Sequence, residues 1–136
     1  MVKDKIFKKE FAVELFAIAQ NDLQAAITLN SDPLVKKETA LLMIQQCVEK
    51  CLKALLCHVE AAIPQTPDLS LLIDRISSAK IAIPAHIANT DFDALTPFAT
   101  LRRYEEGRFE ILDRDVQDAI HLAKSVVNWT QQELNS

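Results

Sequence analysis

Apolar residues recur every three or four positions through most of the chain, and this spacing predicts amphipathic helices. The first run spans residues 11–29 and presents one apolar stripe, made of Phe11, Leu15, Ile18, Ala19, Leu23 and Ala26. The polar sequence at 30–33 ends this helix, and we expect Asp32 to cap the next one with Pro33 at its first position. No run alternates convincingly between apolar and polar residues, so we expect no β-strands.

The second predicted helix, residues 34–62, has apolar residues over more than half of its circumference and is expected to be central. One face carries Ile44, Val48, Leu55, Val59 and Ala62. The remaining strip is polar, is expected to face solvent or a partner, and consists of Gln46, Glu49, Lys50, Lys53, Cys57 and Glu60.

Proline and aspartate mark the elements that follow. Pro64 and Pro67 bracket a break, and we expect Asp68 to cap a short helix whose apolar residues are Leu69, Leu72, Ile73 and Ile76. A further helix is expected from residue 90 or 91 toward Gly107, where Pro97 either kinks it or marks its true start. Gly107 is best placed as a left-handed cap at its end.

The last predicted helix is capped by Asp113 and has the core stripe Val116, Ala119, Ile120, Ala123, Val126, Val127 and Thr130, with Trp129 at its edge. Four long helices and a short one, joined by modest loops, predict an all-α, antiparallel up-and-down four-helix bundle. We expect a single domain over residues 1–136.

Composition narrows the class of function. The chain is 49% hydrophobic and 25% charged, as in a folded domain that needs neither disulfides nor a structural metal. A net charge of −4 argues against coating nucleic acid or anionic membranes through the overall field, so any anion site must be local. Gly107 is the only glycine, which excludes P-loop and Rossmann phosphate sites. Residues 1–10 carry no cleavage signal and lead into no membrane-spanning run, so we expect a cytoplasmic protein.

The three cysteines fall within one predicted helix. Cys47 and Cys51 are one turn apart, and His58 lies two turns further along that stripe, so a metal site of two cysteines and one histidine is conceivable. A fourth ligand and zinc-type Cys-x-x-Cys spacing are absent, so we interpret the cysteines as small residues at the core edge. We expect no metal and no cofactor.

Two segments resemble the HEPN domain family. Residues 44–56, Ile-Gln-Gln-Cys-Val-Glu-Lys-Cys-Leu-Lys-Ala-Leu-Leu, resemble its second-helix signature, in which a Glu-Lys pair leads into Leu-Lys-Ala-Leu. Residues 104–109, Tyr-Glu-Glu-Gly-Arg-Phe, resemble its Tyr-x-x-x-Arg-Tyr-Pro segment. The chain departs from the family at residues 67–69, where Pro-Asp-Leu replaces His-Asp-Leu, and at residues 109–110, where Phe-Glu replaces Tyr-Pro. These losses weaken any role that rests on that histidine or tyrosine.

The resemblance implies a helical bundle that forms a homodimer and acts beside a minimal nucleotidyltransferase, as in a toxin–antitoxin-like pair. Members divide into ribonucleases and non-catalytic or nucleotide-binding modules. We favour the non-catalytic, nucleotide-binding interpretation. A metal-independent ribonuclease and a purely structural adaptor are the alternatives.

Ribonuclease members carry an arginine, a following polar residue and a histidine a few positions later, a pattern that Arg114, Asp115 and His121 fit. A histidine can move a proton from a ribose 2′-hydroxyl, and an arginine can stabilise charge on the phosphate. Seven residues are two helical turns, so both side chains share a stripe with Cα atoms roughly 10 Å apart. That stripe points away from the apolar face, where catalytic and ordinary surface residues look alike in sequence.

A second candidate is an arginine cluster, Arg102, Arg103, Arg108 and Arg114, whose guanidinium groups suit phosphate oxygens. Neighbouring carboxylates could instead make the region a salt-bridged surface. Tyr104 and Arg108 are four residues apart and can hold a base and a phosphate, or close one end of the bundle. Lys50 and Lys53 extend a binding surface or are simply solvated. The expected nucleotide contacts are therefore Arg103, Tyr104, Arg108, Lys50 and Lys53.

Overall fold

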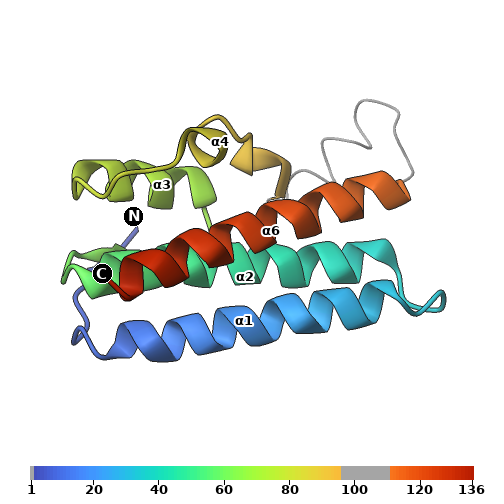
Figure 1. Cartoon of the computed structure of the whole chain (residues 1–136), viewed down its shortest axis with the longest axis horizontal. Coiled ribbons are helices and arrows are strands. Elements are labelled where there is room, and N and C mark those ends of the chain that lie inside the picture. The colour runs from blue at the N-terminus through green and yellow to red at the C-terminus, as the bar shows by residue number, and fades with distance from the viewer. Residues whose placement is uncertain (1, 96–110) are drawn as a thin grey trace.

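The computed structural model describes residues 2–95 and 111–136, and most of this part of the chain is helical. It has three long helices, α1 (Phe11–Asn30), α2 (Lys37–His58) and α6 (Asp113–Leu134), and three short ones, α3 (Leu69–Ser78), α4 (Ala85–Ala88) and the 3-10 helix η1 (Phe92–Leu95) (Figure 1). The expected all-α class is confirmed. None of the helices within the described ranges is both long enough and apolar enough to cross a bilayer.

The N-terminal segment pairs with the segment that follows α2. Strand β1 (Asp4–Lys5) lies antiparallel to β2 (Ile63–Pro64), with Lys5 opposite Ile63. The expectation of no strands was wrong, because strands of two residues are too short to show alternation in a sequence. Arg75 on α3 reinforces the attachment through an ion pair with Asp4, 2.9 Å between Nη1 and Oδ2.

The directions of the three long helices can be followed in Figure 1; the expected four-helix, up-and-down arrangement also needs the long helix predicted up to Gly107, most of which lies outside the described residues. α1 is antiparallel to both of its neighbours, whereas α2 and α6 lie side by side and run the same way (Figure 1). Their first turns are joined by an ion pair of 3.4 Å between Lys37 Nζ and Asp113 Oδ1. Of the further long helix, expected from residue 90 or 91 toward Gly107, the described part contains only the 3-10 helix η1. Pro97 and Gly107 lie outside that part.

As expected, α2 is central. It contacts α1, α6 and α3, and Ile44, Val48, Leu52 and Leu55 are almost completely buried. It is shorter than predicted, however. Asp32 does not cap it: the Asp32 Oδ1 accepts the backbone N–H of Leu34 and the Asp32 carbonyl accepts that of Val35, so the residue closes a turn that contains Pro33.

The C-terminal end of α2 also differs from the prediction. The helix stops at His58 because Glu60 takes a positive φ of 58°, which ends a right-handed helix. Val59 and Ala62, expected on the buried face, therefore lie beyond the helix.

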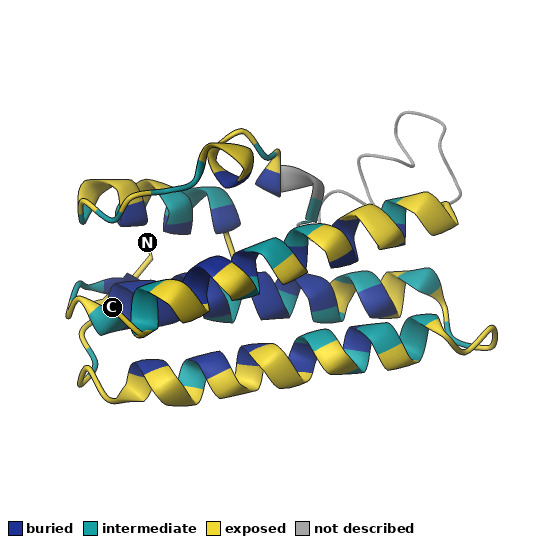
Figure 2. Cartoon of the chain, in the orientation of Figure 1, coloured by how far each residue is buried: buried dark blue, intermediate teal, exposed yellow. Residues whose placement is uncertain are grey.

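The first helix is rotated relative to the predicted stripe. Its buried residues are Ala12, Phe16, Ala19, Asp22 and Ala26, whereas Phe11 and Ile18 are 36% and 43% exposed (Figure 2). Three alanines at seven-residue spacing let α1 approach its neighbours closely, and this outweighs the burial of two larger side chains on the flank.

The other helices follow the sequence more closely. Asp68 caps α3, its side chain accepting the N–H of Leu71 at 3.2 Å. The stripe predicted for α6 is buried except for Val127, which is half-buried. Asp113 is the first residue of α6 and does not cap it. The cap residue is Leu112, whose backbone N–H donates a hydrogen bond to Asp115 Oδ2 at 2.8 Å.

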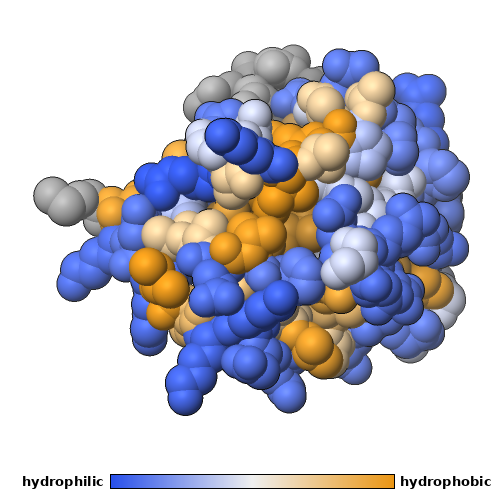
Figure 3. Space-filling view, turned by 60° about the vertical axis from the view of Figure 1, so that its left-hand side comes forward, coloured by the Kyte–Doolittle hydropathy of each residue, from blue (hydrophilic) through white to orange (hydrophobic). Residues whose placement is uncertain are grey.

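The surface of the protein is not uniformly polar. Figure 3 turns the end that carries both termini forward and shows apolar groups gathered in the middle of that face, ringed by hydrophilic ones. Large apolar side chains are also exposed elsewhere among the described residues, Leu34 most of all at 92%.

Trp129, predicted at the edge of the apolar stripe of α6, is only 4% exposed. Its indole Nε1 has no hydrogen-bond partner among the described residues. An unpaired buried donor costs about 1–3 kcal/mol. We therefore expect Trp129→Phe to unfold in urea within about 1 kcal/mol of the parent, because losing the orphan N–H offsets the lost volume. Trp129→Ala should lose about 3–5 kcal/mol through the cavity that it leaves. Equal losses in the two variants would show that the indole N–H makes a stabilising contact.

Candidate functional site

Arg114 and His121 both project from α6. Arg114 is the second residue of the helix and His121 follows two turns later, which separates their Cα atoms by about 10 Å. Both residues are exposed, on the side opposite the buried stripe. The structure therefore places this predicted pair on one accessible stripe, which we call the α6 stripe.

The carboxylates around the start of α6 are partly engaged with other groups. Asp113 pairs with Lys37, and Asp115 accepts the N–H of Leu112. Arg114 lies between them in sequence but forms no ion pair within residues 2–95 and 111–136. The side chain is exposed, so solvent can reach it in this part of the structure.

Asp118 is a member of the α6 stripe that the sequence reasoning missed. It is exposed and stands four residues after Arg114 and three before His121, a spacing that places all three on one helix face. The sequence could have predicted this position of Asp118, because residues three and four apart share a helix face. Its negative charge lowers the local potential that an anion at Arg114 would experience.

A pocket of about 300 Å³ opens beside the stripe. It is lined by Leu41, Thr90, Asp91, Leu95, Asp115, Asp118, Ala119 and Leu122. Three carboxylates make it unsuitable for a phosphate group, so an anionic ligand would be held on the stripe and not in the pocket.

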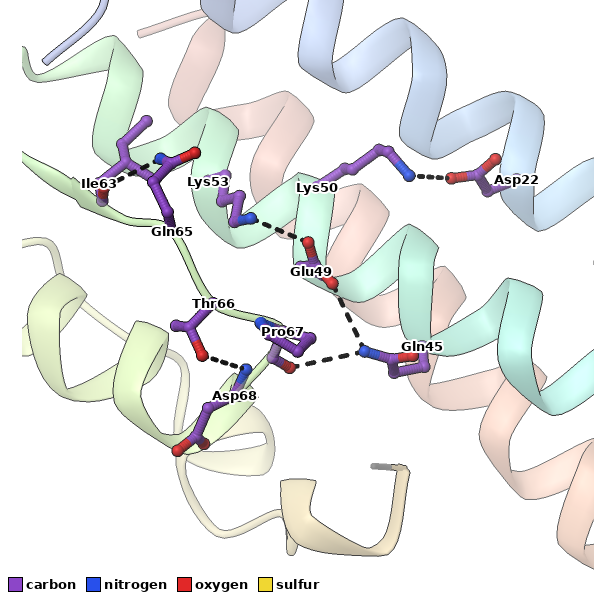
Figure 4. Close-up of polar contacts among 10 residues, drawn as sticks. All are labelled: Asp22, Gln45, Glu49, Lys50, Lys53, Ile63, Gln65, Thr66, Pro67 and Asp68. Atoms are coloured by element: carbon purple, nitrogen blue, oxygen red, sulfur yellow. Dashed lines mark hydrogen bonds and ion pairs between the residues drawn. The ribbon is translucent and has the colours of Figure 1, made fainter. Parts of the chain in front are cut away.

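Lys50 and Lys53, the two lysines predicted to bind a ligand, are each engaged with a carboxylate (Figure 4). Lys50 Nζ lies 2.9 Å from Asp22 Oδ2, and Lys53 Nζ lies 2.9 Å from Glu49 Oε2. Both lysines are half-buried, so this part of the predicted solvent strip is less open than expected.

Gln45 extends the Lys53–Glu49 contact to the segment before α3. It is buried, and its Nε2 donates to Glu49 Oε1 at 3.4 Å and to the carbonyl of Pro67 at 3.5 Å. These contacts join α2 to the segment before α3, and the separate Lys50–Asp22 pair joins α2 to α1, so both groups have a structural role.

The lysines and the α6 stripe do not come together. Lys50 turns toward α1, whereas α2 meets α6 through its buried apolar face, and in Figure 4 α6 passes behind α2 as seen from the lysines. One ligand cannot readily touch both Lys50 and Arg114 of the same chain.

All three cysteines are buried and free. A hydrogen bond with Cys51, together with burial, raises the pKa of the Cys47 thiol. Burial and the nearby Glu10 carboxylate raise the pKa of Cys57, whose Sγ donates to the carbonyl of Lys8 at 3.2 Å. Cys57 was expected on the solvent strip; the N-terminal segment covers it. Within the described ranges, no three His, Cys, Asp or Glu side chains are grouped to hold a metal ion.

The remaining predicted residues, Arg102, Arg103, Tyr104 and Arg108, lie outside the described residues. Their roles stay predictions.

The Asp22–Lys50 ion pair yields a stability test. Asp22 is 6% exposed, so Lys50→Met would leave a buried carboxylate without its partner and should cost about 2–3 kcal/mol in urea unfolding. Adding Asp22→Leu should recover most of this loss. Lys53→Met is the matched control and should cost about 0.5 kcal/mol, because Glu49 is a neighbour on the same helix. Equal costs for the two lysines would contradict the structural role of Lys50.

No curated protein and no solved structure matched the chain. The family model described as HEPN domain matches residues 12–134, which include α1, α2, α3 and α6 almost entirely. The match covers most of the chain and agrees with the resemblance carried by residues 44–56, and so the chain belongs to the HEPN domain family.

Proposed function

We propose that this chain is a non-catalytic HEPN module that binds a nucleotide, or the phosphates of an RNA, at the α6 stripe. The observation that supports this best is the contrast among its cations. Lys50 and Lys53 are each 2.9 Å from a carboxylate, whereas Arg114 is exposed and forms no ion pair within the described residues.

A guanidinium group binds phosphate oxygens through two parallel hydrogen bonds, so Arg114 would provide the principal contact. In this proposal Arg103 and Arg108 add further cations, and the Tyr104 ring stacks on the base. Lys50 and Lys53 take a secondary part, because a ligand would have to displace Asp22 and Glu49 to reach them.

The proposal extends to partners. Membership of the family supports a homodimer that works in the cytoplasm with a minimal nucleotidyltransferase, in a toxin–antitoxin-like pair. Copurification of the two proteins from cells that express both would test the second partner.

Titration calorimetry with mononucleotides tests the binding site. Arg114→Ala and Arg108→Ala should each weaken binding by about 10- to 100-fold, the value of one charge-assisted contact. Asp118→Asn should strengthen it several-fold by removing a negative charge from the α6 stripe. Asp74→Asn, the same change at an exposed position on α3, is the control and should have no effect. Absence of heat at millimolar nucleotide would overturn the proposal.

A metal-independent ribonuclease is the second candidate, because Arg114 and His121 are both exposed on one stripe two turns apart. His121 would take the proton from a ribose 2′-hydroxyl as its oxygen attacks the adjacent phosphorus; the bond from phosphorus to the 5′-oxygen of the next nucleotide breaks, leaving a 2′,3′-cyclic phosphate, and the departing oxygen takes a proton from water. Arg114 would stabilise the charge that develops on the phosphate.

If this candidate is correct, the purified protein cleaves RNA in the presence of EDTA, and His121→Ala loses at least about 100-fold in rate. His58→Ala, a change at a histidine at the far end of α2, is the control. Equal cleavage by the parent and His121→Ala would identify a contaminating nuclease and end the ribonuclease proposal.

A further inference from the structure

Cys57 lies on the polar strip of α2, yet solvent does not reach it. Lys50 and Lys53 on the same strip keep 25% and 17% of their side chains exposed, whereas Cys57 is 0% exposed. The Cys57 Sγ lies 3.2 Å from the carbonyl oxygen of Lys8 and 3.9 Å from that of Lys9. The N-terminal segment is therefore the layer that separates this thiol from water.

That layer is thin. We call residues 3–9 the N-terminal strap. None of its residues is buried, and within it Phe7 alone is half-buried and packs against the core. By contrast, α2 has eleven buried residues. A segment with few buried apolar contacts opens at a much lower free-energy cost than the core of the same protein.

The contacts that attach the strap to β2 and α3 are few. β1 pairs with β2 over two residues, and the backbone N–H of Gln65 donates to the carbonyl of Lys3 at 2.7 Å. Asp4 pairs with Arg75 at 2.9 Å, but the two side chains are 41% and 38% exposed. Ion pairs this open to solvent contribute little stability. The attachment is therefore sufficient to hold the strap in place but weak enough to be broken separately.

The other contacts lie within the strap or at its junction with α1. Lys5 Nζ is 5.0 Å from the centroid of the Phe7 ring, and this pair moves with the strap. Phe7 stacks on Phe11, the first residue of α1, with ring centroids 5.1 Å apart. Glu10, the N-cap residue of α1, makes no side-chain capping bond. Since no capping side chain fixes the junction, it can serve as the hinge.

We propose that the N-terminal strap detaches as a unit from the end of α2 while α1, α2 and α6 stay packed, and that the Cys57 thiol is accessible only in the detached state. The strap is then a gate over this thiol, and a small electrophile or disulfide reaches Cys57 only after the gate opens. The inference does not depend on the proposed nucleotide site. Figure 1 shows both termini at one end of the bundle and the start of α6, which carries Arg114, at the other.

Charge makes the gate sensitive to ionic strength. The strap carries four lysines and one aspartate, a net charge of +3, in a chain whose net charge is −4, which leaves −7 on the remaining residues. Opposite net charges draw the strap toward the bundle. Dissolved salt screens this attraction together with the exposed Asp4–Arg75 pair, so we expect salt to favour the detached state.

Native-state labelling of the full chain with N-ethylmaleimide, followed by peptide mapping, tests the gate. Cys57 should react at least about 100-fold faster than the core cysteines, Cys47 and Cys51, which become accessible only when the helices separate. Dividing each rate by that of the urea-unfolded chain removes differences in intrinsic reactivity. Equal rates at all three cysteines would show that only global unfolding exposes Cys57, and would overturn the proposal.

Two substitutions identify the strap as the part that moves. Arg75→Ala removes the ion pair with Asp4 and should raise the Cys57 rate about 2- to 5-fold, while the core cysteines keep the parent's rates. Lys37→Ala is the matched control, because Lys37 is as exposed as Arg75 and its ion pair lies at the other end of α2. It should leave the Cys57 rate unchanged, and an equal effect of the two substitutions would contradict the gate. Sodium chloride at about 1 M should accelerate the parent more than Arg75→Ala.

A disulfide between β1 and β2 provides the converse test. Asp4 and Pro64 are directly opposite in the ladder, so Asp4→Cys combined with Pro64→Cys brings two thiols within disulfide distance. In the oxidised form Cys57 should label as slowly as the core cysteines, and reduction should restore the faster rate. A Cys57 rate that stays fast in the cross-linked form would show that the thiol is reached by another route and refute the proposal.

Discussion

α2 has apolar side chains over more than half of its circumference, and their burial requires neighbours on three sides. α1, α6 and α3 supply them, and the remaining side is closed by charged residues that neutralise one another. The ion pair between Asp22 and Lys50 fixes how α1 sits on α2, because a carboxylate that is 6% exposed is tolerated only opposite its cation. The rotation of α1 about its own axis follows from that pairing, and with it the set of residues left on the outer side.

Periodicity predicted what depends on one helix at a time. The central place of α2, the Asp68 cap and the buried apolar stripe of α6 each depend on residues within a few turns of one another, and the structure confirms all three. The orientation of α1 could not be predicted in this way. Its sequence supports two overlapping stripes, one through Phe11 and Ile18 and one through Ala12 and Ala19. The choice between them is made by contacts to another helix, including Asp22 to Lys50, which are 28 residues apart.

The same limit applies to the candidate site. The sequence places Arg114 and His121 on one exposed stripe because helix geometry alone decides it. It places Lys50 and Lys53 on a polar strip for the same reason, but the strip is neutralised by Asp22 and Glu49. Glu49 is four residues before Lys53 and could have been paired with it from spacing. Asp22 could not, because nothing local indicates which of the chain's carboxylates faces Lys50.

The charges along α6 limit what its exposed stripe can bind. Arg114 stands near the start of the helix, Asp118 follows one turn later on the same face, and three carboxylates line the pocket beside it. Like charges repel more strongly as they approach, so a phosphate group is favoured at the Arg114 end of the stripe and disfavoured toward the pocket. One guanidinium supplies few contacts, so binding at this stripe depends on the further cations that the proposed function assigns to Arg103 and Arg108.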